Sequence, residues 1–457
     1  MRALFRKKPI LCCGIVFFLY SLVVGLLIQT TVVPKLFTET ASVEGLIIPD
    51  SIGFHQLAVA KAKEINEKGW TYWELRPSGH SPAGIASVIY ALSVEKPFSI
   101  LPFNALVHAL TGCVVLGILL SFFPTGAAIL GSMAFVLNPT AMEWVAQIHK
   151  DGLFVLGSLL LLLCLVNISA PGRPTTIARR GVYFLLGLAG ICISWVARPY
   201  WAPVSFLFSL LIALNWIYSL VSRHGVIHSN RQKAFVLFCF LGLLLAQNYA
   251  ANYRPVDLLF SNTAYRVFSP SSGAISNPAD IISNPADINK PEVWYRSEFL
   301  PERLDQKFLS LASARLGVTA TGGATLIDGK STFNSANDVL SYVPRALQIG
   351  LFSPFPDLWF GDGSTPVMTL ARKVTGFFTL MGYLGIGSFF VALVSLRKRT
   401  EFRALAIMCF SSIILLAIVM PNIGTLIRMR FGFYAMCMAF GVSFLVAHIQ
   451  RGTQKSA

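Results

Sequence analysis

Long apolar stretches recur from the beginning of this sequence to its end, and they decide what the chain can fold into. A helix needs about 20 mostly apolar residues to cross roughly 30 Å of hydrocarbon. Only 13% of the residues are charged, against roughly 25% in a soluble domain. The sequence therefore predicts an all-α polytopic integral membrane protein with about 10 transmembrane helices. We place them at 9–33, 100–122, 126–138, 152–168, 182–197, 200–221, 234–250, 374–396, 404–420 and 432–449.

The positive charges predict the orientation of these helices. Sixteen Lys and Arg residues gather on one side of the membrane with a single acid, Glu401. Because cytoplasmic loops carry an excess of Lys and Arg, both termini are expected in the cytoplasm. The net charge of +16 thus reflects membrane topology rather than nucleic-acid binding. These cations are Arg2, Arg6, Lys7, Lys8, Arg173, Arg179, Arg180, Arg223, Arg231, Lys233, Arg397, Lys398, Arg399, Arg403, Arg451 and Lys455.

The same orientation divides the chain into three regions. A transmembrane core is expected over 1–250, with a first outer loop at 34–99. A large extracytoplasmic loop follows at 251–373, and C-terminal transmembrane helices occupy 374–457. The apolar run 82–94 is expected to lie in the outer interface, because an eleventh crossing would invert the positive side.

Two local patterns predict helix boundaries. The stretch PDSIGFHQLAVAKAKEINEKGW indicates an outer helix that starts at Ser51, with Asp50 and Ser51 as its N-terminal cap. The apolar stretch 126–138 is too short to cross a bilayer alone, so we expect its helix to begin in the loop before it.

The large outer loop contains one perfect tandem copy, ISNPADI at 275–281 and again at 282–288. A calcium loop needs oxygen ligands at alternating positions and a distal Glu, which this spacing does not supply. The copy is typical of a duplication in a Pro- and Asn-rich turn region.

Two features bear on the compartment. MRALFRKK resembles the charged start of a signal peptide, but no small-residue cleavage site follows Val33, so we expect a retained anchor. The outer loops contain no N-x-S/T acceptor with x other than Pro. This favours a bacterial inner membrane over the secretory pathway.

The segment QIHKDGLF places His149, Lys150 and Asp151 between two apolar stretches. One interpretation is a loop that touches water, with Asp151 favoured in the first turn of a helix by the helix dipole. The other is a functional group held at the outer membrane edge. Arg198, in WVARPYW, lies at an outer turn between Trp195 and Trp201. Basic and acidic groups from separate loops are expected to converge if the protein binds a lipid phosphate and deprotonates a substrate.

Further charges lie near the outer ends of the predicted helices. Arg428 and Arg430, in NIGTLIRMRFGFY, lie on the side that the positive-inside rule disfavours. They indicate either snorkelling to lipid headgroups or the binding of a lipid phosphate. The other outer charges of this kind include Asp50, His55, His80 and Arg345.

Several chemistries are excluded by residue type. The sequence has no phosphate-binding G-x-x-x-x-G-K-[ST], no H-E-x-x-H and no G-x-S-x-G motif. His55, His80 and His149 could join acids as ligands of a divalent metal, but their spacing matches no fixed metal motif. We therefore predict no certain cofactor, with a divalent metal as the alternative.

The ordered motifs resemble the membrane glycosyltransferases that use polyprenyl-phosphate sugars. This C-type superfamily contains the protein O-mannosyltransferases and the lipid A aminoarabinose transferases. The resemblance covers about residues 1–220, in order and spacing. It is carried by PDSIGFHQLA, GHSPAGIASVIYAL, the turn PTG, NPTAMEWVAQIHKDGLF and ARPYW.

The resemblance implies an active site on the outer face. It implies Asp50 as the catalytic base, Asp151 as a second catalytic acid and Arg198 as a ligand of the donor phosphate. Many members have two adjacent acids in the first loop, whereas Ser51 follows Asp50 here. NIGTLIRMRF also resembles sequences in bacterial surface-polysaccharide assembly proteins.

The resulting hypothesis is an inverting membrane glycosyltransferase. It would move a sugar from a polyprenyl-phosphate donor to a glycan, lipid or protein acceptor on the outer face, in cell-surface glycan or lipid modification. Membrane lipids are expected partners, and nucleic acid is not. The substrate-binding residues would be His55, His80, Lys150, Arg198, Arg345, Arg428 and Arg430.

Two other functions stay open at this point. In an O-antigen-type polymerase or ligase, the arginines of the large outer loop would act, namely Arg303, Arg315 and Arg345. A lipid-linked sugar flippase or other transporter would place charged groups near the middle of the membrane. The predicted spans contain almost no ionisable residue apart from His108.

Overall fold

The computed structural model describes residues 8–36, 44–170, 176–222, 230–252, 291, 293–320, 325–362 and 366–456. Apart from isolated bridges, the described residues form helices and contain no strand. The all-α prediction is therefore confirmed. The ISNPADI copies and Arg2, Arg6, Lys7, Arg173 and Arg223 lie outside the described residues.

Nine helices of the described part are long and apolar enough to cross a membrane, or ten if one bent pair forms a single span. This confirms the prediction of about ten crossings. The nine are α2 (Pro9–Leu27, continued to Leu36), α6 (Leu101–Leu119, with the turn before it), α9 (Asp151–Ser169), α10 (Ile177–Ala197), α11 (Trp201–Val221), α12 (Asn230–Asn252), α18 (Pro366–Ser395), α19 (Thr400–Val419) and α20 (Ile423–Ser456).

The bent pair corrects the prediction for the shortest apolar stretch. Helix α7 (Thr125–Val136) is followed by α8 (Pro139–Val145), at an angle of 59°. The additional length therefore lies after the stretch and not in the loop before it. Pro139 lacks the N–H that would continue the α7 ladder. Asn138 instead starts a new helix, because its side chain accepts a hydrogen bond from Thr140 N at 3.0 Å.

Two compact units divide the described residues. The larger unit lies within 1–265, 381–408 and 435–457, and the smaller within 266–380 and 409–434. In the larger unit, α9 is the most enclosed membrane helix, with 89% of its apolar window buried against 28% for α2. It packs against α6 and α10, and both ends of α9 therefore lie among other helices.

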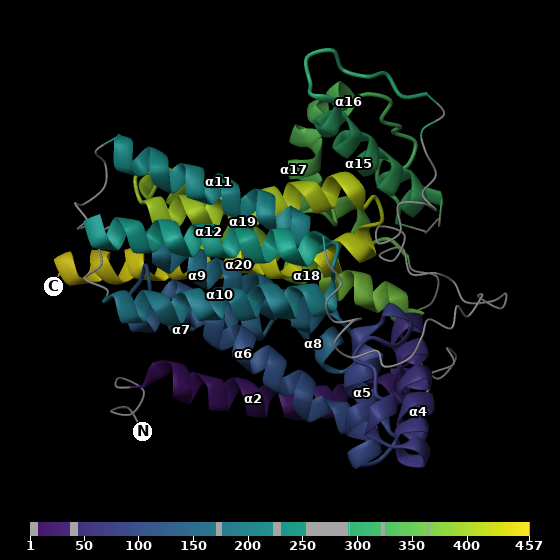
Figure 1. Cartoon of the computed structure of the whole chain (residues 1–457). Coiled ribbons are helices and arrows are strands. Elements are labelled where there is room, and N and C mark those ends of the chain that lie inside the picture. The colour runs from purple at the N-terminus through teal and green to yellow at the C-terminus, as the bar shows by residue number, and fades with distance from the viewer. Residues whose placement is uncertain are drawn as a thin grey trace. The chain divides into compact units, whose positions relative to one another are not determined.

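The first outer loop of the larger unit folds around two helices, α4 (Pro49–Lys68) and α5 (Ser81–Leu92). Figure 1 shows both at the end of α2 and α6 where α8 also lies. Twelve residues are too few to cross a bilayer, as expected for 82–94. Buried side chains join α4, α5 and the loop before α9 in one core: Leu46, Phe54, Ala58, Ala62, Ala83, Ala86, Tyr90, Ile100 and Ile148.

The predicted cap of the first outer helix is wrong. Helix α4 begins two residues earlier, at Pro49, with Ile48 as N-cap and no side-chain cap bond. The fixed φ of Pro favours the first helical position. Ser51 Oγ donates instead to Ile148 O at 3.0 Å, so this side chain connects α4 to the loop before α9.

The smaller unit contains α15 (Glu302–Ala320), α16 (Ala336–Ser341) and α17 (Val343–Phe352). Two hydrogen bonds join the segment after α15 to the turn between α19 and α20: Ile327 N donates to Pro421 O at 2.9 Å, and Ile423 N donates to Thr325 O at 3.1 Å.

Close contact between α18 and α20 generates a test of the membrane packing. A Cβ added at Gly441 would lie 1.8 Å from Gly385 O, whereas one added at Gly387 would meet nothing within 4 Å. We expect Gly441→Val to lower the free energy of unfolding by about 1–3 kcal/mol through overpacking. Gly387→Val on the same helix as Gly385 is the matched control, with an effect within about 0.5 kcal/mol. Thermal unfolding in detergent measures both, and equal losses would contradict the packing of these two helices.

Candidate functional site at the start of α9 and the end of α10

A buried ion pair joins the start of α9 to the end of α10. Asp151 is the first residue of α9, and Arg198 directly follows α10. Their side chains are 1% and 2% exposed, and Arg198 Nη2 donates to Asp151 Oδ1. The other carboxylate oxygen, Oδ2, lies 2.7 Å from His149 Nδ1. Asp151 is thus held between a guanidinium and an imidazole.

Aromatic groups complete the surroundings of Arg198. Its Nη1 donates to Tyr200 OH, and its guanidinium lies 5.1 Å from the centre of the Phe154 ring. The Phe154 ring meets Trp201 edge-on. Burial opposes the charge of Arg198, but Tyr200 and Asp151 outweigh it and raise the pKa of the guanidinium above its ordinary value. Arg198 is therefore a fixed cation.

One donor of this guanidinium has no hydrogen-bond partner among the described residues. Arg198 Nε is buried and unpaired, while both Nη atoms are engaged. Buried donors in native proteins almost always have a partner, and an exception requires an explanation. A ligand with anionic oxygens would supply the missing acceptor.

The loop before α9 is buried and not a solvated connection. Gln147, Ile148, His149 and Lys150 are all buried, and Ile148 accepts the hydrogen bond from Ser51 on α4. The first interpretation of QIHKDGLF, a loop that touches water, is therefore wrong. Asp151 does lie in the first helical turn, as predicted.

The predicted residues of the first outer loop lie on or next to α4 and α5. Asp50 is partly exposed in the first turn of α4 and directly precedes Ser51. His55 is buried with its Nδ1 2.9 Å from Tyr90 OH, and burial lowers its pKa. The ring of His80 lies 5.0 Å from that of Phe54. Both histidines therefore pack α4 against α5, and their role toward a substrate stays a prediction.

In the smaller unit, Arg430 closes the end of a helix. Its guanidinium is buried and donates to the carbonyl oxygens of Ile349, Gly350 and Ser353. Gly350 and Ser353 lie at the C-terminal end of α17, where carbonyls lack partners within the helix, while Ile349 O also accepts from Ser353 N at 3.1 Å. A phosphate would compete with them for this guanidinium. Arg428 is half-buried in the first part of α20.

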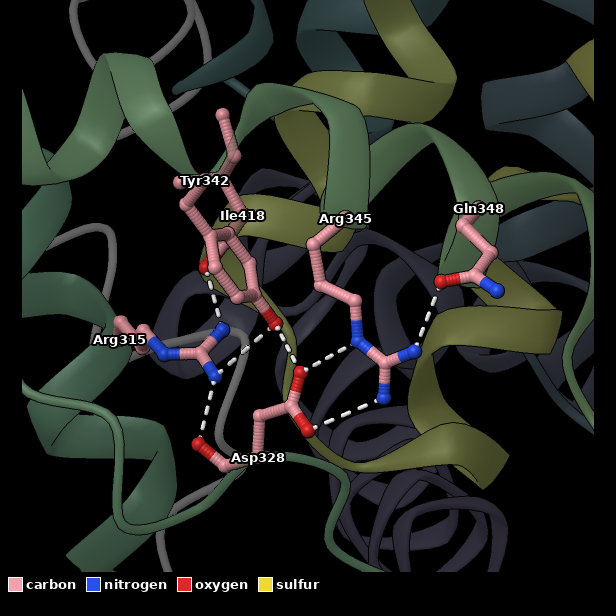
Figure 2. A network of polar contacts seen from close by, with 6 residues as sticks. All are labelled: Arg315, Asp328, Tyr342, Arg345, Gln348 and Ile418. Carbon is pink, nitrogen blue, oxygen red and sulfur yellow. Dashed lines mark hydrogen bonds and ion pairs between the residues drawn. The ribbon is translucent and has the colours of Figure 1, made fainter.

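Arg345 belongs to a polar network around Asp328 (Figure 2). Its Nε and Nη2 donate to the two Asp328 oxygens at 2.9 and 3.2 Å, and its Nη1 donates to Gln348 at 2.8 Å. The Arg345 bond lowers the pKa of Asp328. Because the Arg345 side chain is 40% exposed, it is oriented and still accessible.

Arg315 is buried in the same network. It is 2% exposed and donates to Ile418 O and to Asp328 O, each at 2.9 Å (Figure 2). The rings of Phe333 and Tyr342 lie 5.2 and 4.9 Å from its guanidinium. These contacts hold Arg315 inside the smaller unit, and its role in a polymerase or ligase stays a prediction.

A divalent metal would need a further set of ligands. Within the described ranges, no three His, Cys, Asp or Glu side chains are grouped to hold a metal ion. His149 and Asp151 could supply two metal ligands, but His149 Nδ1 and Asp151 Oδ2 contact each other at 2.7 Å.

Known proteins match this chain by structure and not by sequence. No family model matches the sequence, and no curated protein does. The archaeal oligosaccharyltransferase AglB from Archaeoglobus fulgidus, in complex with an inhibitory peptide and a dolichol-phosphate, aligns with 99% of this chain at 13% identity and a TM-score of 0.49. The apo form of the Archaeoglobus fulgidus oligosaccharyltransferase aligns with 97% at 11% identity and a TM-score of 0.50.

The chain shares its fold with the second of these solved structures, the apo oligosaccharyltransferase. At this identity the second alignment shows the fold alone. The chain spans about half the length of these solved proteins, since it covers 52% of each.

The buried pair predicts a strong coupling between Asp151 and Arg198. Removing one partner leaves the other charge buried, which costs about 3–5 kcal/mol. We expect Asp151→Asn and Arg198→Gln to lower the free energy of unfolding each by this amount. The double variant should lose less than the sum, because removing both leaves no isolated charge.

The measurement is a double-mutant cycle by unfolding in detergent. The control pair is Lys61 and Glu74, which lie 3.0 Å apart with 20% and 35% of their side chains exposed. Its coupling is expected below about 1 kcal/mol. A coupling between Asp151 and Arg198 no larger than that of the control would contradict the buried pair.

Proposed function

We propose that this protein is a membrane glycosyltransferase that moves a sugar from a polyprenyl-phosphate donor to an acceptor on the outer face of the membrane. The observation that carries the proposal is the buried guanidinium of Arg198, fixed by Asp151 and Tyr200, with one donor left for a ligand. The fold shared with an oligosaccharyltransferase supports it. A bacterial inner membrane and a role in cell-surface glycan or lipid modification are part of the proposal.

Arg198 would bind the donor phosphate through Nε. It would stabilise the negative charge that grows on the phosphate as the sugar leaves. Two unit charges about 4 Å apart interact by roughly 4 kcal/mol at an effective dielectric constant of about 20. Because Asp151 already neutralises part of the guanidinium charge, the net gain is smaller. Even half of this energy would correspond to a rate increase of roughly 30-fold.

The reaction would be a single inverting displacement. The acceptor hydroxyl oxygen attacks the anomeric carbon, and the bond from that carbon to the phosphate oxygen breaks. Asp50 accepts the hydroxyl proton, and the polyprenyl phosphate leaves with the bonding electron pair. Asp50 is suited to this role because its side chain is partly exposed at the start of α4, while Asp151 is engaged by Arg198 and His149.

A polymerase or ligase is the second candidate, supported by one observation. Arg345 is oriented by Asp328 and Gln348 and is still 40% exposed. An arginine presented in this way can bind a sugar phosphate or a carboxylate of a glycan. In this case transfer would depend on Arg345 and not on Asp50.

The variant Asp50→Asn tests the proposed function. The amide has nearly the same shape as the carboxylate but cannot accept the proton, so we expect product to fall by at least about a hundredfold. Product is measured by mass spectrometry of surface glycans and lipid A from cells with and without the gene. Protein level and membrane insertion should not change.

Glu67→Gln is the matched control, because Glu67 is an exposed acid on the same helix. It should retain full activity. Near-normal transfer by Asp50→Asn would exclude Asp50 as the base. Loss of transfer in Arg345→Gln together with an active Asp50→Asn would favour the polymerase or ligase.

A further inference from the structure

Side chains from three other elements hold the backbone of the loop before α9. Gln29 Nε2 donates to Ala146 O at 2.9 Å. Asn104 Nδ2 donates to Val145 O and Gln147 O at 3.1 and 2.9 Å. With the bond from Ser51 to Ile148, every carbonyl from Val145 to Ile148 has a side-chain partner. These residues come from the first span, from α6 and from α4.

Gln147 extends this arrangement in the opposite direction. Its Oε1 accepts from Ile47 N at 3.0 Å, and its Nε2 donates to Gly45 O at 2.9 Å. The side chain is 2% exposed and bonds the segment before α4 as a neighbouring strand would. Gly45 has a φ of +85°, and a Cβ there would lie 2.2 Å from Gln29 O. The segment before α4 is therefore in close contact with the backbone of the first span.

Gln29 lies at an irregular position of the first span. It belongs to the π-helical turn Ile28–Val32, which follows α2 directly. Such turns are rare and frequently occur at functional sites. Here the turn accompanies an amide group that is buried in an apolar span and that donates to Ala146.

Burying these side-chain amides stabilises the fold little and carries a free-energy risk. A paired hydrogen bond adds only about 1 kcal/mol net, whereas a buried amide that loses its partner costs about 1–3 kcal/mol. Apolar side chains would fill the same volume without the cost of an unpaired polar group. What the amides add is a fixed register between the segment that enters α4 and the loop that enters α9.

We infer that Gln147 is a positioning residue that fixes Asp50 relative to Asp151 and Arg198. Asp50 lies three residues after Ile47 and directly before Ser51. The bonds from Gln147 to Gly45 and Ile47 therefore hold the chain before Asp50, and the bond from Ser51 to Ile148 holds it after Asp50. His149 and Asp151 follow Gln147 within four residues. This inference rests on the proposed function, since it couples the proposed base to the proposed phosphate site.

Gln147→Met tests the inference, because Met fills a similar volume and removes the side-chain hydrogen bonds to Ile47 N, Gly45 O and Ala146 O. The matched control is Gln247→Met. Gln247 is fully buried in the same unit, and its Nε2 donates to Ser209 Oγ at 3.0 Å, between α12 and α11. Both variants lose a buried amide, but only Gln147→Met releases the segment before α4.

Hydrogen exchange followed by mass spectrometry is the first measurement. We expect peptides that cover residues 44–52 to exchange at least about tenfold faster in Gln147→Met, because the Ile47 amide loses its acceptor and the start of α4 opens locally. Gln247→Met should leave these peptides unchanged. Unchanged exchange in Gln147→Met would overturn the inference.

Binding and turnover separate a positioning role from general support of the site. Undecaprenyl phosphate is the probe, and its affinity for detergent-solubilised protein is measured by native mass spectrometry. Gln147→Met should bind it within about twofold of wild type and lose at least about tenfold in glycan product, in keeping with the loss of catalytic geometry. Loss of probe binding would overturn the positioning role.

The outcomes distinguish this inference from the proposed function. If exchange rises in Gln147→Met while Asp50→Asn stays fully active, the register is supported and Asp50 is not the base. If Gln147→Met does not reach the membrane, Gln147→Asn is the second variant. Its side chain is one methylene shorter, so the bonds to Ile47 N and Gly45 O at 3.0 and 2.9 Å cannot both be kept. Faster exchange at residues 44–52 supports the inference, and unchanged exchange overturns it.

Discussion

The ion pair between Asp151 and Arg198 is the constraint on which the site depends. Two charges that are almost fully buried are stable only when each has its partner. Because Asp151 is the first residue of α9 and Arg198 follows α10, the pair joins the start of one membrane helix to the end of another. The imidazole of His149 contacts the carboxylate of Asp151. The ring of Phe154 and the hydroxyl of Tyr200 contact the guanidinium of Arg198.

The large-scale fold was predictable from the sequence because the bilayer sets the length of a crossing. Apolar stretches of about 20 residues can hardly form anything other than spans. The bend between α7 and α8 was not predicted, because Asn138 was assigned to the end of the span 126–138 and no second helix was expected after it. The helical outer run 82–94 followed from the charge balance, and its 12 residues agree with that.

The site was only partly predictable. Asp151 and Arg198 were selected because charges at membrane edges are costly, and the structure brings these two together. The roles of Gln29, Asn104 and Gln147 were missed, because each binds backbone carbonyls whose neighbours depend on the tertiary fold. A signal did exist, since Gln29 and Asn104 are amides within predicted spans. The contacts of Arg315 were missed for a similar reason, as its partners Ile418 and Asp328 are remote in sequence.

A structure with undecaprenyl phosphate bound tests the central claim most directly. The account predicts a phosphate oxygen within about 3.2 Å of Arg198 Nε, with the bonds from Arg198 to Asp151 and Tyr200 retained. The donor would then lie at the outer ends of α9 and α10, where the buried guanidinium has its unpaired N–H. A phosphate bound at Arg345, with Arg198 Nε still without a partner, would contradict the account.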